Sequence, residues 1–197
     1  MTMIIALADT QNCEALPEHI KETASKADII LHAGDFGSDL IYENLVELSD
    51  DYGSELIMVK GNSDNKLSPG YYSTLKSKNC VKLGDIKIGL VHGDLFLGDG
   101  FQKAFQNANE TAAKFKTEED TEFGVQVLVF GHIHYPFIAN GKERMLICPG
   151  SPTEPRNGSA ASYAQIDINN GIVKAKIISL DLQSDYQLNG WSKPYSI

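Results

Sequence analysis

Five short blocks of the sequence combine carboxylate, amide and imidazole side chains with glycine. They are Asp9-Thr10-Gln11, Gly34-Asp35, Gly61-Asn62-Ser63-Asp64, His92-Gly93-Asp94 and Gly131-His132-Ile133-His134. Imidazole and carboxylate ligands suit divalent ions such as manganese, iron, zinc or nickel. Two such ions about 3.5–4 Å apart can clamp a phosphoryl group, and they acidify a water that then attacks it. We therefore expect a dinuclear metal site that hydrolyses phosphate esters.

The Gly-His-x-His block is the most specific of the five. Side chains two positions apart on an extended segment point the same way, so His132 and His134 can meet one centre. The other blocks each have a plainer reading when taken alone. Asp9 could cap a turn, the glycine-containing blocks could be turns, and His92 could be a hydrogen-bonded core histidine. We interpret His19 and His32 as structural residues outside the site.

The elements that must position these blocks can be read from the hydrophobic pattern. Apolar runs of β type occur at residues 3–8, 29–31, 55–59, 86–91, 125–130, 145–148, 163–168 and 172–178. Helical stripes separate the early runs, and they consist of Leu16, Ile20 and Ala24, then Leu40, Ile41, Leu45 and Leu48. Strand–helix alternation predicts a parallel sheet. After residue 125, turns such as Asn140-Gly141 and Asn170-Gly171 indicate antiparallel hairpins, which favours two stacked sheets with outer helices.

The five blocks all follow predicted strands. Ligands of α/β proteins bind in the loops beyond the carboxyl ends of the strands. One polar residue at such a place is common, but metal-type residues at five strand ends are hard to explain as turns. The blocks are therefore expected to assemble at one edge of the molecule.

Length and composition fit one soluble domain, residues 1–197, with 42% hydrophobic and 22% charged residues. The net charge of −9 argues against broad nucleic-acid binding but allows a small phosphate-ester substrate at a locally positive metal site. Cys13, Cys80 and Cys148 lack metal-type spacing and suggest buried thiols in a reducing compartment. No run is long enough to cross a membrane, and no basic segment precedes the first apolar run. We expect a cytoplasmic protein that could form a homo-oligomer.

Two segments stand apart from the strand pattern. Residues 97–124 carry apolar side chains at helical spacing, which predicts a helix packed on the core, with a cap over the site as the alternative. Within them, the acidic run at residues 118–122 is expected to be a solvated turn. The tail, residues 181–197, has weak periodicity. It could pack through Tyr186 and Trp191 or, with Tyr195, contact a partner.

With these residues in hand, the chain resembles the calcineurin-like metallophosphoesterase superfamily. Within it, the chain is most similar to the small bacterial and archaeal phosphodiesterases, whose family includes the retromer subunit of this fold. The superfamily pattern is Asp-x-His, Gly-Asp, Gly-Asn, a His-Gly block and Gly-His-x-His. The likeness extends from residue 3 to about residue 180 and includes Pro149-Gly150-Ser151-Pro152 and Pro155-Arg156.

The resemblance implies a four-layer α/β/β/α sandwich with two stacked mixed β-sheets. It implies two divalent metal ions, manganese first, with zinc, iron, nickel or magnesium as alternatives. Their ligands would be Asp9, Gln11, Asp35 and His134 at the first site, and Asp35, Asn62, His92 and His132 at the second. Asp35 would bridge the ions, and Asn62 would also contact the substrate phosphate. The residues expected to serve catalysis are Asp35, Asn62, Asp64 and His92.

The chain departs from the superfamily pattern at three places. Gln11 replaces a histidine, and its amide oxygen is a weaker ligand for manganese or zinc, so we expect weak occupancy of the first site. Ser63 stands where many members have a histidine that protonates the leaving group. Asp64 would then tune the ligands from behind. Cys148 replaces an asparagine and is expected to be structural.

These features support a metal-dependent phosphoesterase, most simply a phosphodiesterase. Gln11 motivates an alternative, a protein of the same fold that has lost turnover and acts as a scaffold for partners. A third hypothesis is a regulatory module that binds a nucleotide without cleaving it.

Overall fold

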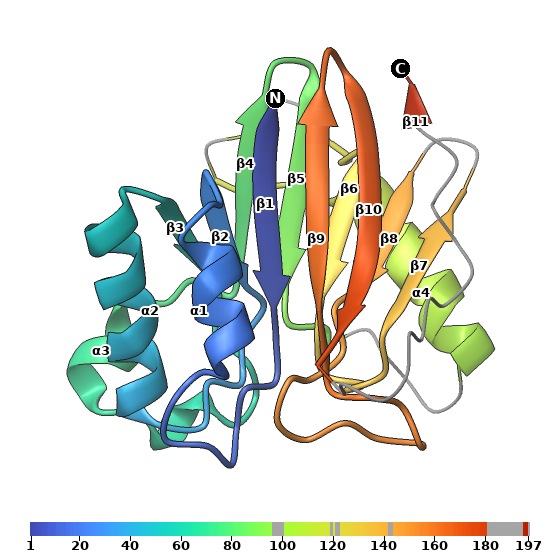
Figure 1. Cartoon of the computed structure of the whole chain (residues 1–197). Coiled ribbons are helices and arrows are strands. Elements are labelled where there is room, and N and C mark those ends of the chain that lie inside the picture. Colours follow the sequence, from blue (N-terminus) through green and yellow to red (C-terminus); the bar gives the residue numbers. More distant parts are fainter. Residues whose placement is uncertain (96–100, 119, 121–122, 142–143, 181–194, 197) are drawn as a thin grey trace.

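The computed structural model describes residues 1–95, 101–118, 120, 123–141, 144–180 and 195–196. In these residues the strands form two mixed sheets (Figure 1). The first sheet has the order β11, β10, β9, β1, β2, β3. Its strands are β1 (Thr2–Leu7), β2 (Ile29–His32), β3 (Glu55–Met58), β9 (Ser162–Asn169), β10 (Ile172–Ser179) and β11 (Tyr195–Ser196). Strands β1, β2 and β3 run parallel, whereas β9 and β10 join them antiparallel.

The second sheet has the order β4, β5, β6, β8, β7. Its strands are β4 (Lys78–Leu83), β5 (Ile86–Val91), β6 (Val127–Phe130), β7 (Phe137–Asn140) and β8 (Met145–Cys148). The central strands β5, β6 and β8 are parallel, and the edge strands β4 and β7 are antiparallel to their neighbours.

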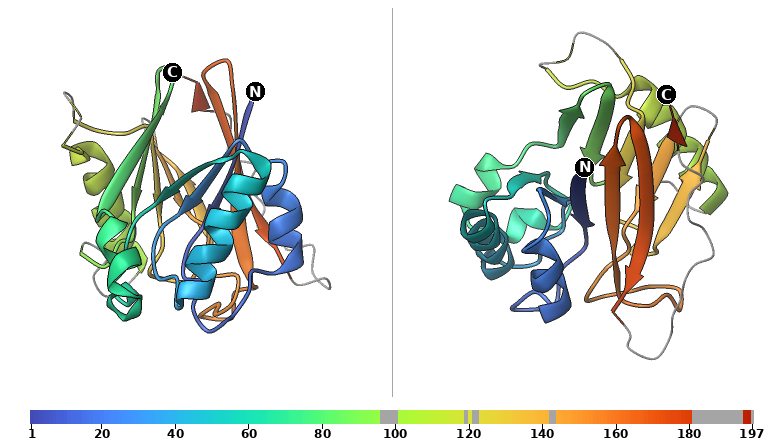
Figure 2. Two further views of the ribbon diagram at one scale, coloured as in Figure 1. Left: turned by 90° about the vertical axis from the view of Figure 1, so that its left-hand side faces the viewer. Right: turned by 45° about the horizontal axis from the view of Figure 1, so that its top comes forward.

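Helices cover the outer face of each sheet (Figures 1 and 2). They are α1 (Glu18–Ala24), α2 (Asp39–Tyr52), α3 (Pro69–Thr74) and α4 (Phe101–Lys114), with a short 3-10 helix η1 (Asp64–Lys66). Helices α1 and α2 pack on the first sheet, and α4 packs on the second. The expected four-layer α/β/β/α sandwich with two stacked mixed β-sheets is confirmed.

Alternation along the strands divides the apolar side chains among the layers. In β1, Ile4 and Ala6 belong to the cluster between the two sheets, whereas Ile5 and Leu7 face α1 and α2. A third cluster lies under α4 and includes Ala108 and Phe115. This arrangement follows from the two-residue period of a strand, because each face of both sheets is covered. Two-sided burial also explains why the parallel strands are continuous apolar runs.

The turns after residue 125 fold as the sequence predicts. Asn170 and Gly171 have φ values of 49° and 76° and connect β9 to β10, which pair in register from Asn169 and Ile172. Two consecutive residues of positive φ give the twist that a tight hairpin needs. Strands β7 and β8 are antiparallel as the Asn140-Gly141 pair predicts, and the Gly141 N–H donates to the Arg144 carbonyl at 2.8 Å.

Three details differ from the sequence expectations. Strands β4 and β7 were not predicted. They are edge strands with few buried side chains, β4 is interrupted by polar residues, and the apolar run of β7 is only three residues long. Leu40 does not complete the predicted stripe of α2, since it is 49% exposed while Ile41 and Leu45 are buried. The acidic run is not wholly solvated, because Asp120 is buried and lies 2.8 Å from Lys87 Nζ.

The two unusual segments are partly described. Helix α4 confirms the predicted helix. Its buried Ala108 and Ala112, with Phe115 directly after the helix, pack on the outer face of the second sheet rather than over the site. In the tail, only residues 195–196 are described, and they form β11 beside β10. The predicted contacts of Tyr186 and Trp191 lie outside the described residues. No helix within the described part of the chain has the length and hydropathy of a membrane span.

Candidate metal centre

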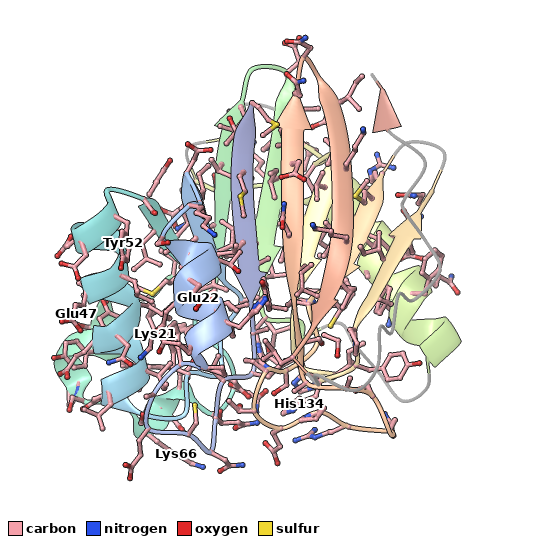
Figure 3. All side chains as sticks on the ribbon, viewed as in Figure 1. Lys21, Glu22, Glu47, Tyr52, Lys66 and His134 are labelled. Carbon is pink, nitrogen blue, oxygen red and sulfur yellow. The ribbon has the colours of Figure 1, made fainter. Side chains whose placement is uncertain are left out.

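The structure brings the five blocks together at one edge of the two sheets. Asp9 follows β1, Asp35 follows β2 and Asn62 follows β3 in the first sheet. His92 follows β5 in the second sheet, and the histidines of the Gly-His-x-His block follow β6. His134 lies at the lower end of the molecule in the view of Figure 3, where these strands end. The site therefore lies where the carboxyl ends of parallel strands from both sheets meet.

Two carboxylates and one imidazole form the centre of the site. Asp9, Asp35 and His92 are buried, with exposed fractions of 0%, 3% and 1%. Each offers one ligand atom, and these atoms all lie within 4.8 Å of one another. His92 Nε2 is 3.5 Å from Asp35 Oδ2. Buried carboxylates packed this closely call for a compensating cation, because each would otherwise be desolvated beside a like charge.

A second group of ligand-type atoms lies on one side of this centre. We call Asn62, His92 and His132 the second group. The Oδ1 atom of Asn62 is 3.0 Å from His92 Nε2 and 2.9 Å from His132 Nδ1. Asn62 is exposed and His132 half-buried, so the second group opens to solvent, where a substrate can enter.

On the other side lies the first group, which we define as Asp9, Gln11 and His134. His134 Nε2 is 3.5 Å from Asp9 Oδ1 and 3.2 Å from the side-chain nitrogen of Gln11. The amide oxygen of Gln11 accepts a hydrogen bond of 3.4 Å from the Ser63 hydroxyl. The Gln11 side chain therefore lies between His134 and Ser63 and presents its N–H, not its oxygen, to the imidazole.

Backbone carbonyls fix the orientation of two of the imidazole rings. Nδ1 of His92 lies 2.8 Å from the Ala33 carbonyl, and Nδ1 of His134 lies 2.7 Å from the Glu154 carbonyl. A carbonyl can only accept, so each Nδ1 carries the proton. Nε2 then points into the site. This is how metal-binding histidines are commonly held.

Four residues of the site adopt backbone conformations that side chains rarely take. The φ values of Asp9, Asp35, His132 and His134 are 54°, 60°, 73° and 53°. Left-handed backbone outside glycine costs about 1–3 kcal/mol per residue and clusters at functional sites. The cost at four ligand-type residues indicates that the fold holds these side chains for function rather than for packing.

Asp64 joins two of the loops from behind the site. Its carboxylate accepts backbone N–H groups from Gly61 at 2.6 Å, Asp35 at 2.9 Å and Phe36 at 2.8 Å. It is 1% exposed. Its oxygen atoms are thus occupied by the backbone, and its role in the structure is to hold the Asp35 loop against the Asn62 loop. Gly34 lets the Asp35 loop and the Asn62 loop lie this close together, because a Cβ at position 34 would be only 2.6 Å from the Gly61 nitrogen.

Burial and mutual charge shift the pKa values at the centre. Burial, aided by the charge of Asp35, raises the pKa of Asp9 to about 8. Burial alone would lower the pKa of His92, but its hydrogen bond to Asp35 and the charges of Asp9 and Asp35 raise it to about 9. Burial opposes ionisation of Asp35 too, yet its hydrogen bond with His92 holds the Asp35 pKa below its usual range. Without a metal ion, protons therefore supply part of the missing positive charge.

The residues that we interpreted as structural make contacts outside the two groups. The ring of His32 is fully buried, lies 2.9 Å from the Thr10 hydroxyl and stacks on Phe36. His19 is exposed on α1 and contacts the Tyr163 hydroxyl at 3.1 Å. Cys148 is buried, and burial raises the pKa of its thiol. None of these side chains lies among the two groups.

Sequence reasoning assigned no role to the segment that supports the first group. The Ser151 hydroxyl donates to the Asp9 carbonyl at 2.6 Å, and the Thr153 hydroxyl donates to the Gln11 carbonyl at 2.6 Å. The Pro-Gly-Ser turn was visible in the sequence as part of the family resemblance. Its function as a brace could not be seen, because a hydroxyl bonded to a distant carbonyl leaves no periodic signal.

The donor set fits divalent metal ions. Three imidazole nitrogens, two carboxylates and two amide side chains are the ligand types expected for manganese, iron, zinc or nickel. Buried carboxylates, fixed rings and clustered ligand atoms are the features expected of such a site. The arrangement could hold two ions, one at each group, with Asp35 near both.

Comparison with known proteins identifies the family and the fold of the chain. The family model of the calcineurin-like phosphoesterase superfamily domain matches residues 1–171. A probable metallophosphoesterase of Methanocaldococcus jannaschii is 33% identical over 141 residues, which cover 72% of this chain but only 62% of that protein. Vacuolar protein sorting 29 of Cryptosporidium parvum has a TM-score of 0.72 at 18% identity, covering 93% of both chains. The Entamoeba histolytica protein of that name, solved with zinc, has a TM-score of 0.69 at 19% identity, covering 93% of this chain and 95% of that one.

Proposed function

The chain belongs to the calcineurin-like phosphoesterase superfamily, and we propose that it hydrolyses a phosphodiester at a dinuclear metal site. The observation that carries this proposal is the buried centre of Asp9, Asp35 and His92, whose ligand atoms lie within 4.8 Å of one another. A centre of this kind has no packing purpose, because two desolvated carboxylates beside each other destabilise a fold that lacks a cation there.

We propose that each group holds one divalent ion. The first ion would be held by the first group with Asp35, and the second ion by the second group with Asp35. Manganese is the preferred metal, and zinc, iron, nickel and magnesium are the alternatives. The zinc complex of the Entamoeba histolytica relative in fold supports a site that can take such an ion.

When bound, two divalent ions would supply an acidified water as nucleophile and positive charge for the phosphoryl group. The residues of the chain then have distinct tasks. Asn62, exposed at the mouth, has its oxygen turned to the two imidazoles and its N–H₂ group free to donate to a phosphate oxygen. His92 and His134 are kept in one ring orientation by carbonyls, and Asp64 positions the Asp35 loop.

The residue at the leaving-group position is Ser63. Its hydroxyl donates to Gln11, and its backbone N–H donates to Asp35 Oδ1 at 2.9 Å. A serine hydroxyl does not release its proton readily, so the alcohol would leave without a general acid. We therefore propose that the enzyme prefers esters of acidic alcohols, such as nitrophenols.

The test is hydrolysis of bis(p-nitrophenyl) phosphate by the full chain loaded with manganese. We expect turnover, and we expect His132→Ala to lower kcat/KM about 100-fold or more, because removing a ligand or its partner typically costs 10–100-fold or beyond. His19→Ala is the matched control, since His19 is exposed and outside the site. Absence of turnover with manganese, nickel and zinc, or equal activity of the two variants, would refute the proposal.

A scaffold that lost turnover is the second candidate function. The observation in its favour is the hydrogen bond between the Gln11 amide and His134 Nε2, which occupies the atom that would bind the first ion. The fold is also that of vacuolar protein sorting 29. If the protein is such a scaffold, we expect the metal-loaded chain to be inactive and Gln11→His to restore activity.

We propose a cytoplasmic, single-domain protein with a small phosphate ester as its substrate. The buried Cys148 thiol and the net charge of −9 support this proposal. Self-association stays a prediction.

A further inference from the structure

The segment between β8 and β9 is tied to the blocks that supply the first group. Hydroxyls of Ser151 and Thr153 donate to the carbonyls of Asp9 and Gln11, each at 2.6 Å. The Ser151 hydroxyl oxygen also accepts the backbone N–H of Glu154 at 2.7 Å. These contacts fix the segment at the edge of the site, so the side chains that follow hold a defined place beside it.

Arg156 follows in this segment, and its backbone is held on both sides. Its N–H donates to the His134 carbonyl at 3.3 Å, and its carbonyl accepts the Ser159 hydroxyl at 2.8 Å. Its side chain is exposed, and no described carboxylate forms an ion pair with it. The hydrogen bond to the His134 carbonyl places the Arg156 backbone directly beside the first group, within the reach of an arginine side chain.

We infer that Arg156 is a specificity-determining residue that binds an acidic group which the substrate carries in addition to its scissile phosphate. This inference rests on the proposed function, because the ester must occupy the metal site for its second group to meet the guanidinium. Arginine offers a planar fork of N–H donors that matches a carboxylate or a phosphate. Its backbone is fixed beside His134, at the first group, and not at the mouth formed by Asn62 and His132.

The charge balance favours the same class of substrate. A phosphodiester has one negative charge, which faces the metal ions. The exposed Arg156 guanidinium is a further positive group beside His134, and a carboxylate elsewhere on the substrate would pair with it. Elsewhere the protein, with its net charge of −9, repels such a ligand, so local cations must select it.

The test uses two stable ligands that bind without turnover. Propylphosphonate and 3-phosphonopropionate have the same phosphonate and the same number of carbon atoms, and only the second bears a carboxylate. Calorimetry gives their Kd values for the manganese-loaded full chain. We expect wild type to bind 3-phosphonopropionate about tenfold more tightly, which is the effect of one favourable charged hydrogen-bonded pair.

Three variants show whether Arg156 causes this preference. Arg156→Gln should bring the Kd ratio to about one by weakening only the carboxylate ligand, and Arg156→Lys should give an intermediate ratio, because lysine keeps the charge without the fork. Lys66→Gln is the matched control. It removes one exposed charge at the same end of the molecule and should leave the ratio unchanged (Figure 3).

Several outcomes would overturn the inference. They are a wild-type ratio near one, no binding of either ligand, equal weakening of both ligands by Arg156→Gln, and an equal effect of Lys66→Gln. Hydrolysis of bis(p-nitrophenyl) phosphate is measured on the same samples. No hydrolysis together with the expected Kd ratios would refute the proposed function and leave the role of Arg156 standing. Hydrolysis with a ratio near one would refute the role of Arg156 alone.

Discussion

At His92, two oxygen atoms lie close to one nitrogen of the ring. Asn62 Oδ1 lies 3.0 Å and Asp35 Oδ2 3.5 Å from Nε2, while Nδ1 faces the Ala33 carbonyl. Both nitrogens face acceptors, which is the pattern of a protonated imidazole, and the pKa of His92 is raised to about 9 in spite of burial. Oxygen atoms of Asp35 and Asn62 thus surround Nε2 of His92, an arrangement of ligand types that suits a divalent ion.

In the first group, Gln11 is the residue that decides how well an ion is held. We expect Gln11→His to raise the affinity of this group for manganese by on the order of 10–100-fold, the range that altered partners at metal sites produce. The reason is that imidazole is a stronger ligand than an amide oxygen, and the amide now donates to His134 instead. Elemental analysis after dialysis should show a rise in metal ions per chain, from nearer one to nearer two.

Gln11→Ala separates the loss of the amide from the gain of a ligand. It removes the hydrogen bond to His134 without supplying an imidazole, so metal content should stay close to that of wild type. Equal metal content in wild type and Gln11→His would show that position 11 does not limit the first group.

At the scale of elements, the sequence predicted best those strands that are buried on both faces. Strands β1 and β6 are continuous apolar runs because the other sheet covers one of their faces and helices cover the other, so composition and burial agree. Edge strands bury fewer side chains, so their sequences show a weaker apolar pattern. Of the six residues of β4, only Val81 is buried, and Lys78, Asn79 and Lys82 are polar, so the pattern of the strand resembles a loop. The Gly84-Asp85 turn between β4 and β5 was the signal that could have revealed it.

The segment after α4 is joined to the second sheet by Asp120, which the charge pattern placed in solvent. Its carboxylate contacts Lys87 Nζ at 2.8 Å, Lys82 Nζ at 3.2 Å and the Thr117 N–H at 2.9 Å. We expect Asp120→Asn to lower the free energy of unfolding by about 2 kcal/mol, because it removes the charge from a largely buried ion pair. Urea unfolding at pH 7 measures this difference.

The pH dependence of that difference has a definite sign. Burial would raise the pKa of Asp120, but its contacts with Lys87, Thr117 and Lys82 outweigh burial and hold it below the ordinary value. A depressed carboxyl pKa adds stability at neutral pH, and this stability is lost as the pH falls below about 4 through the folded-state pKa. The gap between wild type and Asp120→Asn should therefore shrink in acid. Glu118→Gln, an exposed change in the same run, should cost less than about 0.5 kcal/mol, and an equal cost would contradict the assignment.

At the scale of the whole molecule, the two stacked sheets bring remote parts of the chain to one edge. The ligand blocks could be predicted because a short stretch of sequence is enough to show a strand end, a glycine or the spacing of two histidines. Their division into two groups could not be derived from local pattern, since it depends on how the sheets stack. The brace formed by Ser151 and the place of Arg156 were hidden for the same reason, as both depend on contacts across about 140 and about 20 positions of the chain.

The stacking also buries the centre, which couples metal binding to protons. Asp9, with a pKa raised to about 8 mainly by burial, and His92, with a pKa of about 9, are both largely protonated at pH 7 in the metal-free protein. A metal ion binds only the deprotonated ligands, so binding at pH 7 should release about two protons per chain, and affinity should rise with pH until about pH 9. Calorimetric titration with manganese in two buffers of different ionisation enthalpy gives this count.

The number of protons released should fall as the titration is moved to pH 9.5, because both groups have then already lost their protons. A count near zero at pH 7 would mean that Asp9 and His92 are not the groups displaced, and the buried centre would then not be where the ion binds.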